Sequence, residues 1–206
     1  MVGNQFDVGN QPDSELWRRV AGGDDDAFAT LYERHAKAVY NFCFRRTADW
    51  SRAEDLVGDV FLVAWRRQAE VVISTESRST LPWLLGVALN VVRNAFRSQR
   101  RGDHALARLD ARMAEEDFSP DLVSRLADEQ QMKAVLEQVD QLPEQEQDAL
   151  ALCAWAGLGY EEAAVALGVP VGTVRSRLSR ARSHLRELLE ASGHDIGDER
   201  VARADH

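Results

Sequence analysis

Apolar residues recur at steps of three and four along most of this chain, and no stretch shows the strict alternation of a half-buried strand. Over residues 25–47 the apolar positions fall on one side of a helix; they are Phe28, Leu31, Tyr32, Val39 and Tyr40. A second stripe, two residues wide, consists of Leu56, Val57, Val60, Phe61, Ala64 and Trp65. The pattern predicts an all-α protein.

Residues with capping chemistry mark the first predicted helices. A short helix over 13–20 is expected to end at the pair Gly22-Gly23. The three aspartates at 24–26 supply an N-cap and favourable negative charge for the helix that follows.

Similar signals delimit the next two helices. Ser51 has a glutamate three residues later, the spacing of a capping box, and so predicts the start of the helix that carries the second stripe. Residues 68–80 read as an exposed loop. Its last residue, Thr80, is expected to cap a further helix that has Pro82 in its first turn.

The segment 160–189 reads YEEAAVALGVPVGTVRSRLSRARSHLRELL, a short helix, a tight Gly-Val-Pro turn and a longer helix. This is the arrangement of a helix-turn-helix unit, whose second helix enters the major groove of DNA. The buried face of that helix is expected to hold Val174, Leu178, Ala181, Leu185 and Leu188. The side chains that can reach base edges are Arg175, Ser176, Ser179, Arg180 and Ser183.

Three more residues of this unit are expected to contact the DNA backbone. Thr173 lies in the first turn of the second helix, where free N–H groups bind phosphate. Arg177 and Arg182 flank the face that reaches the bases.

The formal net charge of −9 at first argues against nucleic acid as a partner, because phosphate binding needs cations. The distribution of the charges reverses that argument. Residues 81–102 hold four arginines and no acid, and residues 171–186 hold five arginines and no acid. Between them, residues 103–129 hold eight acids and three arginines. The first basic stripe consists of Arg93, Arg97, Arg100 and Arg101, with Asn90 and Asn94 on the same side of the predicted helix.

These boundaries divide the chain into two small helical domains joined by an acidic linker. The first domain is expected over 13–102 and the second over 132–190, with the linker over 103–131. Residues 1–12 and 191–206 are polar and are expected to be disordered.

Several function classes are disfavoured by features that the sequence lacks. No apolar run approaches the roughly 20 residues that cross a bilayer, and the first residues do not resemble a signal peptide, so we expect a cytoplasmic protein without membrane insertion. Cys43 and Cys153 lack CxxC spacing and are expected to be buried thiols. The five histidines show no HExxH spacing, and no GxGxxG or P-loop occurs. We therefore expect no enzyme, catalytic residue, metal or cofactor.

Five segments of the chain resemble the extracytoplasmic-function (ECF) subgroup of bacterial RNA polymerase sigma factors. Three of the segments resemble region two of that family: DDAFATLYERHAKAVY (25–40), AEDLVGDVFLVAW (53–65) and LPWLLGVALNVVRNAFRSQRR (81–101). The other two resemble region four: LPEQEQDALAL (142–152) and GLGYEEAAVALGVPVGTVRSRLSRAR (157–182). The resemblance covers nearly the whole chain, from about residue 13 to 189.

The resemblance implies a subunit that directs core RNA polymerase to particular promoters and assists their melting. The second domain would read the duplex minus-thirty-five element through Arg175, Ser176, Ser179 and Arg180. The first domain would bind the melted minus-ten strand with its basic stripe, with Trp83 beside a loop, 68–80, that holds a flipped base. Asp55 and Asp59 fall in the helix that meets the polymerase clamp, and the polymerase flap and an anti-sigma factor are further implied partners.

A stand-alone helix-turn-helix regulator is the alternative hypothesis. It would explain residues 160–189 equally well, but it leaves the stripe over 93–101 and the helix over 53–65 without a role. A gel shift separates the two hypotheses, because such a regulator binds duplex operator DNA without polymerase.

Overall fold

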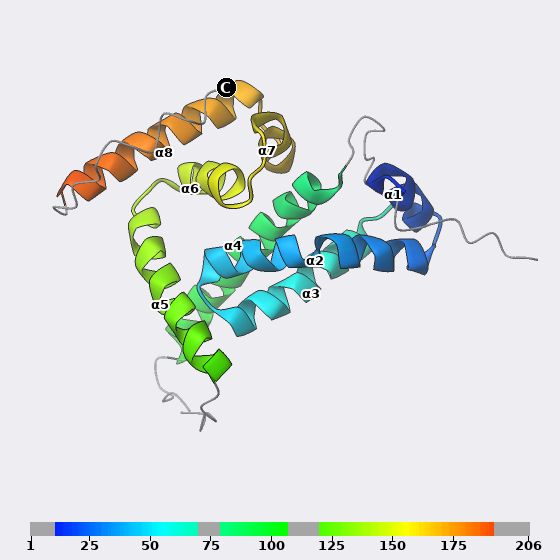
Figure 1. Ribbon diagram of the computed structural model, residues 1–206, viewed down its shortest axis with the longest axis horizontal. Coiled ribbons are helices and arrows are strands. Elements are labelled where there is room, and N and C mark those ends of the chain that lie inside the picture. The colour runs from blue at the N-terminus through cyan, green and yellow to red at the C-terminus, as the bar shows by residue number, and fades with distance from the viewer. Residues whose placement is uncertain (1–10, 70–78, 107–119, 192–206) are drawn as a thin grey trace, which may run out of the picture.

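The computed structural model describes residues 11–69, 79–106 and 120–191, and every regular element within them is helical (Figure 1). Only the backbone is described for residues 100–106, 120–123 and 191. The predicted all-α class is confirmed. The disorder predicted at both ends, most of the predicted loop 68–80 and part of the predicted linker 103–131 lie outside the described residues.

Helices from the first half of the chain form one group, and helices from the second half lie against it (Figure 1). The first group comprises α1 (Asp13–Ala21), α2 (Asp25–Thr47), α3 (Trp50–Arg66) and α4 (Leu81–Leu106). The second comprises α5 (Pro120–Val139), α6 (Glu144–Leu150), the π-helical turn η2 (Ala151–Trp155), α7 (Tyr160–Leu167) and α8 (Val171–Ala191).

The two apolar stripes predicted for α2 and α3 face the core. Leu56, Val57, Val60, Phe61 and Ala64 are all buried, and Trp65 is half-buried. On α2, Leu31 and Val39 are buried, whereas Tyr32 remains 44% exposed. The Tyr32 ring nevertheless contacts α3, because its centroid lies 4.7 Å from that of Phe61 in an edge-on arrangement.

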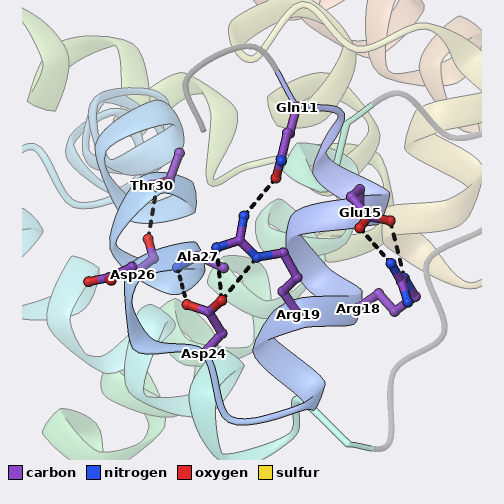
Figure 2. A network of polar contacts seen from close by, with 8 residues as sticks. All are labelled: Gln11, Glu15, Arg18, Arg19, Asp24, Asp26, Ala27 and Thr30. Carbon is purple, nitrogen blue, oxygen red and sulfur yellow. Dashed lines mark hydrogen bonds and ion pairs between the residues drawn. The ribbon is translucent and has the colours of Figure 1, made fainter. Parts of the chain in front are cut away.

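The turn between α1 and α2 is fixed by the predicted aspartate cap. The Asp24 carboxylate accepts a hydrogen bond of 3.0 Å from the backbone N–H of Ala27, which confirms it as the N-cap of α2 (Figure 2). Arg19 of α1 donates two more hydrogen bonds to the same carboxylate, of 2.9 and 2.8 Å. Asp24 therefore joins α1 to the start of α2.

We expect Asp24→Ala to lower the melting temperature by about 2–4 °C. Loss of an N-cap typically costs about 1 kcal/mol of unfolding free energy, and in a chain of this size that cost corresponds to such a shift. Thermal unfolding followed by circular dichroism measures the shift. Asp25→Ala is the matched control, since Asp25 lies in the same first turn but is not the capping residue. Equal shifts for both variants would contradict the assigned role of Asp24.

The start of α3 differs from the prediction. The N-cap is Asp49 and not Ser51, and its carboxylate accepts a hydrogen bond of 2.8 Å from the N–H of Arg52. Ala48 adopts a left-handed conformation, with φ of 49°, and ends α2 directly before this cap. An aspartate two residues upstream thus takes the capping position, and the helix begins earlier than the serine suggested.

The start of α4 lies where the sequence predicted it, but Thr80 has a different partner. Both its N–H and its hydroxyl donate to Asp13 Oδ2, at 2.7 and 3.2 Å. The same oxygen lies 2.6 Å from His35 Nε2, and Arg34 pairs with the other carboxylate oxygen. One buried carboxylate therefore ties together α1, α2 and the residue before α4.

The two halves of the chain share their main hydrophobic core. Ala151, Leu152, Ala163 and Val174 from the second half belong to the same buried cluster as the apolar residues of α1–α4. A smaller cluster, confined to the second half, joins α5, α6 and α8; it contains Val139, Leu142, Ala149, Leu150, Leu178 and Ala181. The second half is thus packed onto the first, with α7 beside α4.

Candidate nucleic-acid interface

The helix-turn-helix unit has the geometry that its sequence predicted. Gly168, with φ of 64°, makes the left-handed turn that ends α7, a conformation that favours glycine. Of the predicted inner face of α8, Val174, Leu178 and Ala181 are buried and Leu185 and Leu188 are half-buried. The packing of this inner face fixes which side of α8 points outward.

The outward side of α8 carries the predicted base-reading residues. All of them are exposed: Arg175, Ser176, Ser179, Arg180 and Ser183. Some of them also contact other groups of the protein. The Arg175 guanidinium lies 5.4 Å from the centre of the Tyr160 ring. Arg180 Nε donates to the carbonyl of Ser176 at 3.3 Å. This face is therefore a polar and cationic surface.

The predicted backbone-contacting residues flank this surface. Arg182 is exposed, whereas Thr173 and Arg177 are half-buried. Thr173 accepts a hydrogen bond of 3.0 Å at its carbonyl from the Ser176 hydroxyl, within the first turn of α8.

A buried glutamate beneath α8 was missed by the sequence analysis. Glu146 of α6 is 5% exposed, and its carboxylate lies 2.7 Å from His184 Nδ1 and 3.9 Å from Arg180 Nε. It thereby links α6 to the outward face of α8. Glu146 and His184 are 38 residues apart, so no local pattern could have paired them.

The second candidate surface is the polar side of α4. Asn90, Asn94 and Arg97 are exposed there. Trp83 is half-buried near the start of the helix, with its ring edge-on to Trp17 at a centroid distance of 5.0 Å. Arg100 and Arg101 belong to α4, but their side chains lie outside the described part of the chain.

Arg93, in the middle of this stripe, faces the second half of the chain. Its guanidinium lies 2.7 Å from a Glu144 carboxylate oxygen and pairs closely with Asp148. Asp148 is 1% exposed, so burial raises the pKa of this carboxyl, against the opposing effect of Arg93 and Arg46. Arg46 is itself buried, and that burial lowers the pKa of its guanidinium. A compact set of charges, of which Arg46 and Asp148 are buried, therefore joins α2, α4 and α6.

The residues predicted to meet polymerase lie on α3. Asp55 and Asp59 are both exposed, one turn apart, on the side opposite the buried stripe.

The two cysteines are free; Cys43 is fully buried and Cys153 is half-buried. Burial raises the pKa of the Cys43 thiol to about 12, so this thiol stays protonated at neutral pH.

Two negative findings apply to the described residues alone. No group of three or more histidine, cysteine, aspartate or glutamate side chains in the described ranges is arranged to hold a metal ion. Within the same ranges, each helix is too short or too polar to cross a bilayer.

Comparison with known proteins identifies both halves of the chain. The family model for sigma-70 region 2 matches residues 31–102, and the model for sigma-70 region 4 matches residues 132–185. RNA polymerase sigma factor CarQ of Myxococcus xanthus is 33% identical over 175 residues, which cover 83% of this chain and 94% of CarQ. ECF RNA polymerase sigma factor SigK of Mycobacterium bovis (strain BCG) is 31% identical over 180 residues, covering 86% of this chain and 93% of SigK.

Solved structures also match this chain over most of its length. CnrH, determined in complex with the cytosolic domain of CnrY, has a TM-score of 0.63 at 26% identity, covering 87% of this chain and 97% of CnrH. Sigma factor RpoE of Bartonella quintana, in complex with the anti-sigma factor NepR, has a TM-score of 0.50 at 26% identity, covering 79% of this chain and 96% of that protein.

These relatives match the two halves together and not the helix-turn-helix unit alone, which disfavours the hypothesis of a stand-alone regulator. With relatives above 30% identity matched over more than nine tenths of their length, the chain belongs to the RNA polymerase sigma factors of the extracytoplasmic-function type.

Proposed function

We propose that this sigma factor reads promoters with two separate surfaces, α8 for the duplex minus-thirty-five element and α4 for the melted minus-ten strand. The exposed face of α8 carries this proposal. It presents Arg175, Ser176, Ser179 and Arg180 side by side on a helix whose opposite face is buried. Arginine binds the guanine edge in a bidentate manner, and the serine hydroxyl can hydrogen-bond to donor or acceptor groups of a base. Such a face can therefore discriminate base pairs in the major groove.

The stripe on α4 suits a single strand. A melted strand needs cations that follow its phosphates and aromatic or amide groups that contact its bases. Arg93 and Arg97 supply the first requirement, and Asn90, Asn94 and Trp83 the second. Arg100 and Arg101, which the sequence assigns to the same stripe, belong to the part of α4 whose backbone alone is described.

The remaining functions require partners. We assign Asp55 and Asp59 to binding the polymerase clamp and the second half of the chain to the flap, while catalysis belongs to the polymerase. An anti-sigma factor is a further proposed partner, since RpoE of Bartonella quintana was determined with the anti-sigma factor NepR. Recovery of the chain from its native cells without any bound protein would count against this partner.

Transcription in vitro with purified core polymerase tests the two-surface proposal. Adding the chain to core enzyme on a library of genomic templates is expected to select a small set of start sites that share two spaced elements. Transcripts that share only one element would remove the assignment of the other surface. Start sites no different from those of core enzyme alone would remove both.

Arg180→Ala is expected to reduce promoter discrimination by about 1–3 kcal/mol, the usual loss for one good base contact. Affinity of the polymerase complex for the cognate element and for a scrambled one measures this difference. Arg182→Ala is the matched control, with the same residue type in the same helix. It should weaken both DNAs alike and lower the salt slope by about one. Equal losses on both DNAs for Arg180→Ala would show that Arg180 contacts phosphate alone.

A further inference from the structure

The buried carboxylate of Glu146 is paired with two side chains that both lie on the outward side of α8. Its Oε2 atom lies 2.7 Å from His184 Nδ1, and its Oε1 atom lies 3.9 Å from Arg180 Nε. We propose that Glu146 is a positioning residue for promoter recognition, which orients the Arg180 guanidinium for the base that it reads, and that His184 holds the Glu146 carboxylate in place. The proposal rests on the proposed function of α8 and extends it to two residues outside the base-reading set.

The partners of this carboxylate argue against a purely stabilising role. Glu146 is buried, whereas the Arg180 and His184 side chains are 61% and 43% exposed. Taking a carboxylate out of water is costly, and such a pair adds little net stability compared with apolar residues of similar volume. Apolar residues such as Leu150 and Leu178 already hold α6 against α8. The pairing therefore favours a role on the outward side of α8, where both partners lie.

Arg180 is held at one edge of its guanidinium group. Its hydrogen bond of 3.3 Å to the carbonyl oxygen of Ser176 and its ion pair with Glu146 both go through Nε. The Nη1 and Nη2 atoms take part in neither of these two contacts, and a fork of parallel N–H donors matches the O6 and N7 acceptors of guanine. A guanidinium fixed at Nε is oriented before DNA arrives, which reduces the entropy that binding would otherwise cost.

A line of polar contacts along α8 ends at the same carboxylate. The Ser176 hydroxyl donates to the carbonyl of Thr173 at 3.0 Å, and the carbonyl of Ser176 accepts from Arg180. One turn further on, His184 Nδ1 donates to the Glu146 carboxylate, because an ionised carboxylate only accepts hydrogen bonds. These contacts connect the outward side of α8 to one position on α6, which packs beside it (Figure 1). Support of this kind from a neighbouring helix is what a preorganised binding site requires.

Loss of this carboxylate should change two properties of DNA binding in opposite directions. Discrimination between promoter and random duplex should fall, because Arg180 loses its fixed orientation. Affinity for random duplex should rise, because a negative charge beside the DNA surface is removed and non-specific binding follows the charge. A residue needed only for the fold would lower both, since a displaced α8 loses its base and phosphate contacts together.

The test is Glu146→Gln in complex with core polymerase, with affinity measured for the cognate minus-thirty-five duplex and for a scrambled one. Glutamine keeps the shape of the side chain and removes its charge. Discrimination should fall about fivefold, the lower end of what one bidentate base contact contributes, while affinity for the scrambled duplex rises. Glu161→Gln is the matched control, because it removes an exposed acid of α7 in the same helix-turn-helix unit and should leave discrimination unchanged.

His184 provides a second pair of variants. His184→Ala should lower discrimination as Glu146→Gln does, since the carboxylate loses the partner that lies 2.7 Å from it. His184→Asn should restore most of the discrimination, because the asparagine amide is a hydrogen-bond donor whose nitrogen, like Nδ1, is bonded to Cγ. The His184 side chain is partly exposed, so these variants keep the test decisive if Glu146→Gln fails to fold.

The Arg180→Ala background separates this proposal from the proposed function. If Glu146 acts through Arg180, adding Glu146→Gln to Arg180→Ala changes discrimination no further. An equal loss from Glu146→Gln in the wild type and in Arg180→Ala would overturn the positioning role, and so would a parallel loss of affinity for both duplexes. Undiminished discrimination in Glu146→Gln and His184→Ala would overturn it as well. If Arg180→Ala alone leaves discrimination unchanged, the base-reading assignment itself falls, and the positioning role falls with it.

Discussion

Asp55→Arg/Asp59→Arg is expected to lose core-polymerase binding by about 100-fold or more while leaving the fold unchanged. Both side chains are exposed on α3, so neither substitution removes a buried contact. Close charge pairs across protein interfaces couple by about 1.5–7 kcal/mol each. The loss of two such pairs, each at the lower end of that range, weakens binding by about 3 kcal/mol, which is about 100-fold in affinity. Fluorescence anisotropy of labelled protein with core enzyme measures the affinity, and thermal unfolding checks the fold.

The control for this variant must change the net charge equally. Asp26→Arg/Glu33→Arg does so at two exposed positions of α2 and is expected to keep wild-type affinity. If both double variants lose affinity alike, overall charge is responsible and α3 is not the docking surface. Undiminished affinity in Asp55→Arg/Asp59→Arg would remove the assignment directly.

Features that depend on residues within one helical turn were predictable. The buried stripe of α3, from Leu56 to Ala64, and the inner face of α8, from Val174 to Ala181, follow from helical periodicity alone. The Asp24 cap follows from a side chain that reaches an N–H three residues away. At the start of α3 the same reasoning failed, because Asp49 and Ser51 both suited a cap and nothing local decided between them.

Features that depend on distant residues were not predictable. Arg93 was assigned to the DNA stripe from its helical position, but its partner Asp148 is 55 residues away. Periodicity placed Arg93 on the polar side of α4 and could not show that α6 lies over that side. The close approach of α4 to α7 is made at Gly86 and Ala166, two small residues that carry no pattern of their own.

Asp13 is the clearest case of a residue whose importance came only from the structure. In sequence it is one acid near a polar end, yet its carboxylate is 1% exposed and accepts hydrogen bonds from Thr80, 67 residues away. Burial alone would raise the pKa of this carboxyl, but the hydrogen bonds from His35, Thr80 and Arg34 outweigh it. The net result is a pKa well below the usual range, so Asp13 is ionised in the folded protein.

Asp13→Ala is accordingly expected to destabilise the protein by about 3–5 kcal/mol, because it leaves the buried partners of a charged group unpaired. Denaturant unfolding measures this loss. Glu15→Ala is the matched control: Glu15 pairs with Arg18 at 2.5 Å in the same helix, but that pair is exposed, and we expect no measurable change. Comparable losses in both variants would show that Asp13 acts through α1 alone.

The dependence on pH separates the charge of Asp13 from its shape. A carboxyl whose folded pKa is depressed stabilises the protein fully above its unfolded pKa of about 3.9 and loses that contribution as the pH falls further. Asp13→Asn keeps the shape but cannot ionise. The difference in unfolding free energy between wild type and Asp13→Asn should therefore be largest at neutral pH and shrink below about pH 4. A difference that stays constant from pH 7 to pH 3 would mean that the network of His35, Thr80 and Arg34 does not depend on the negative charge.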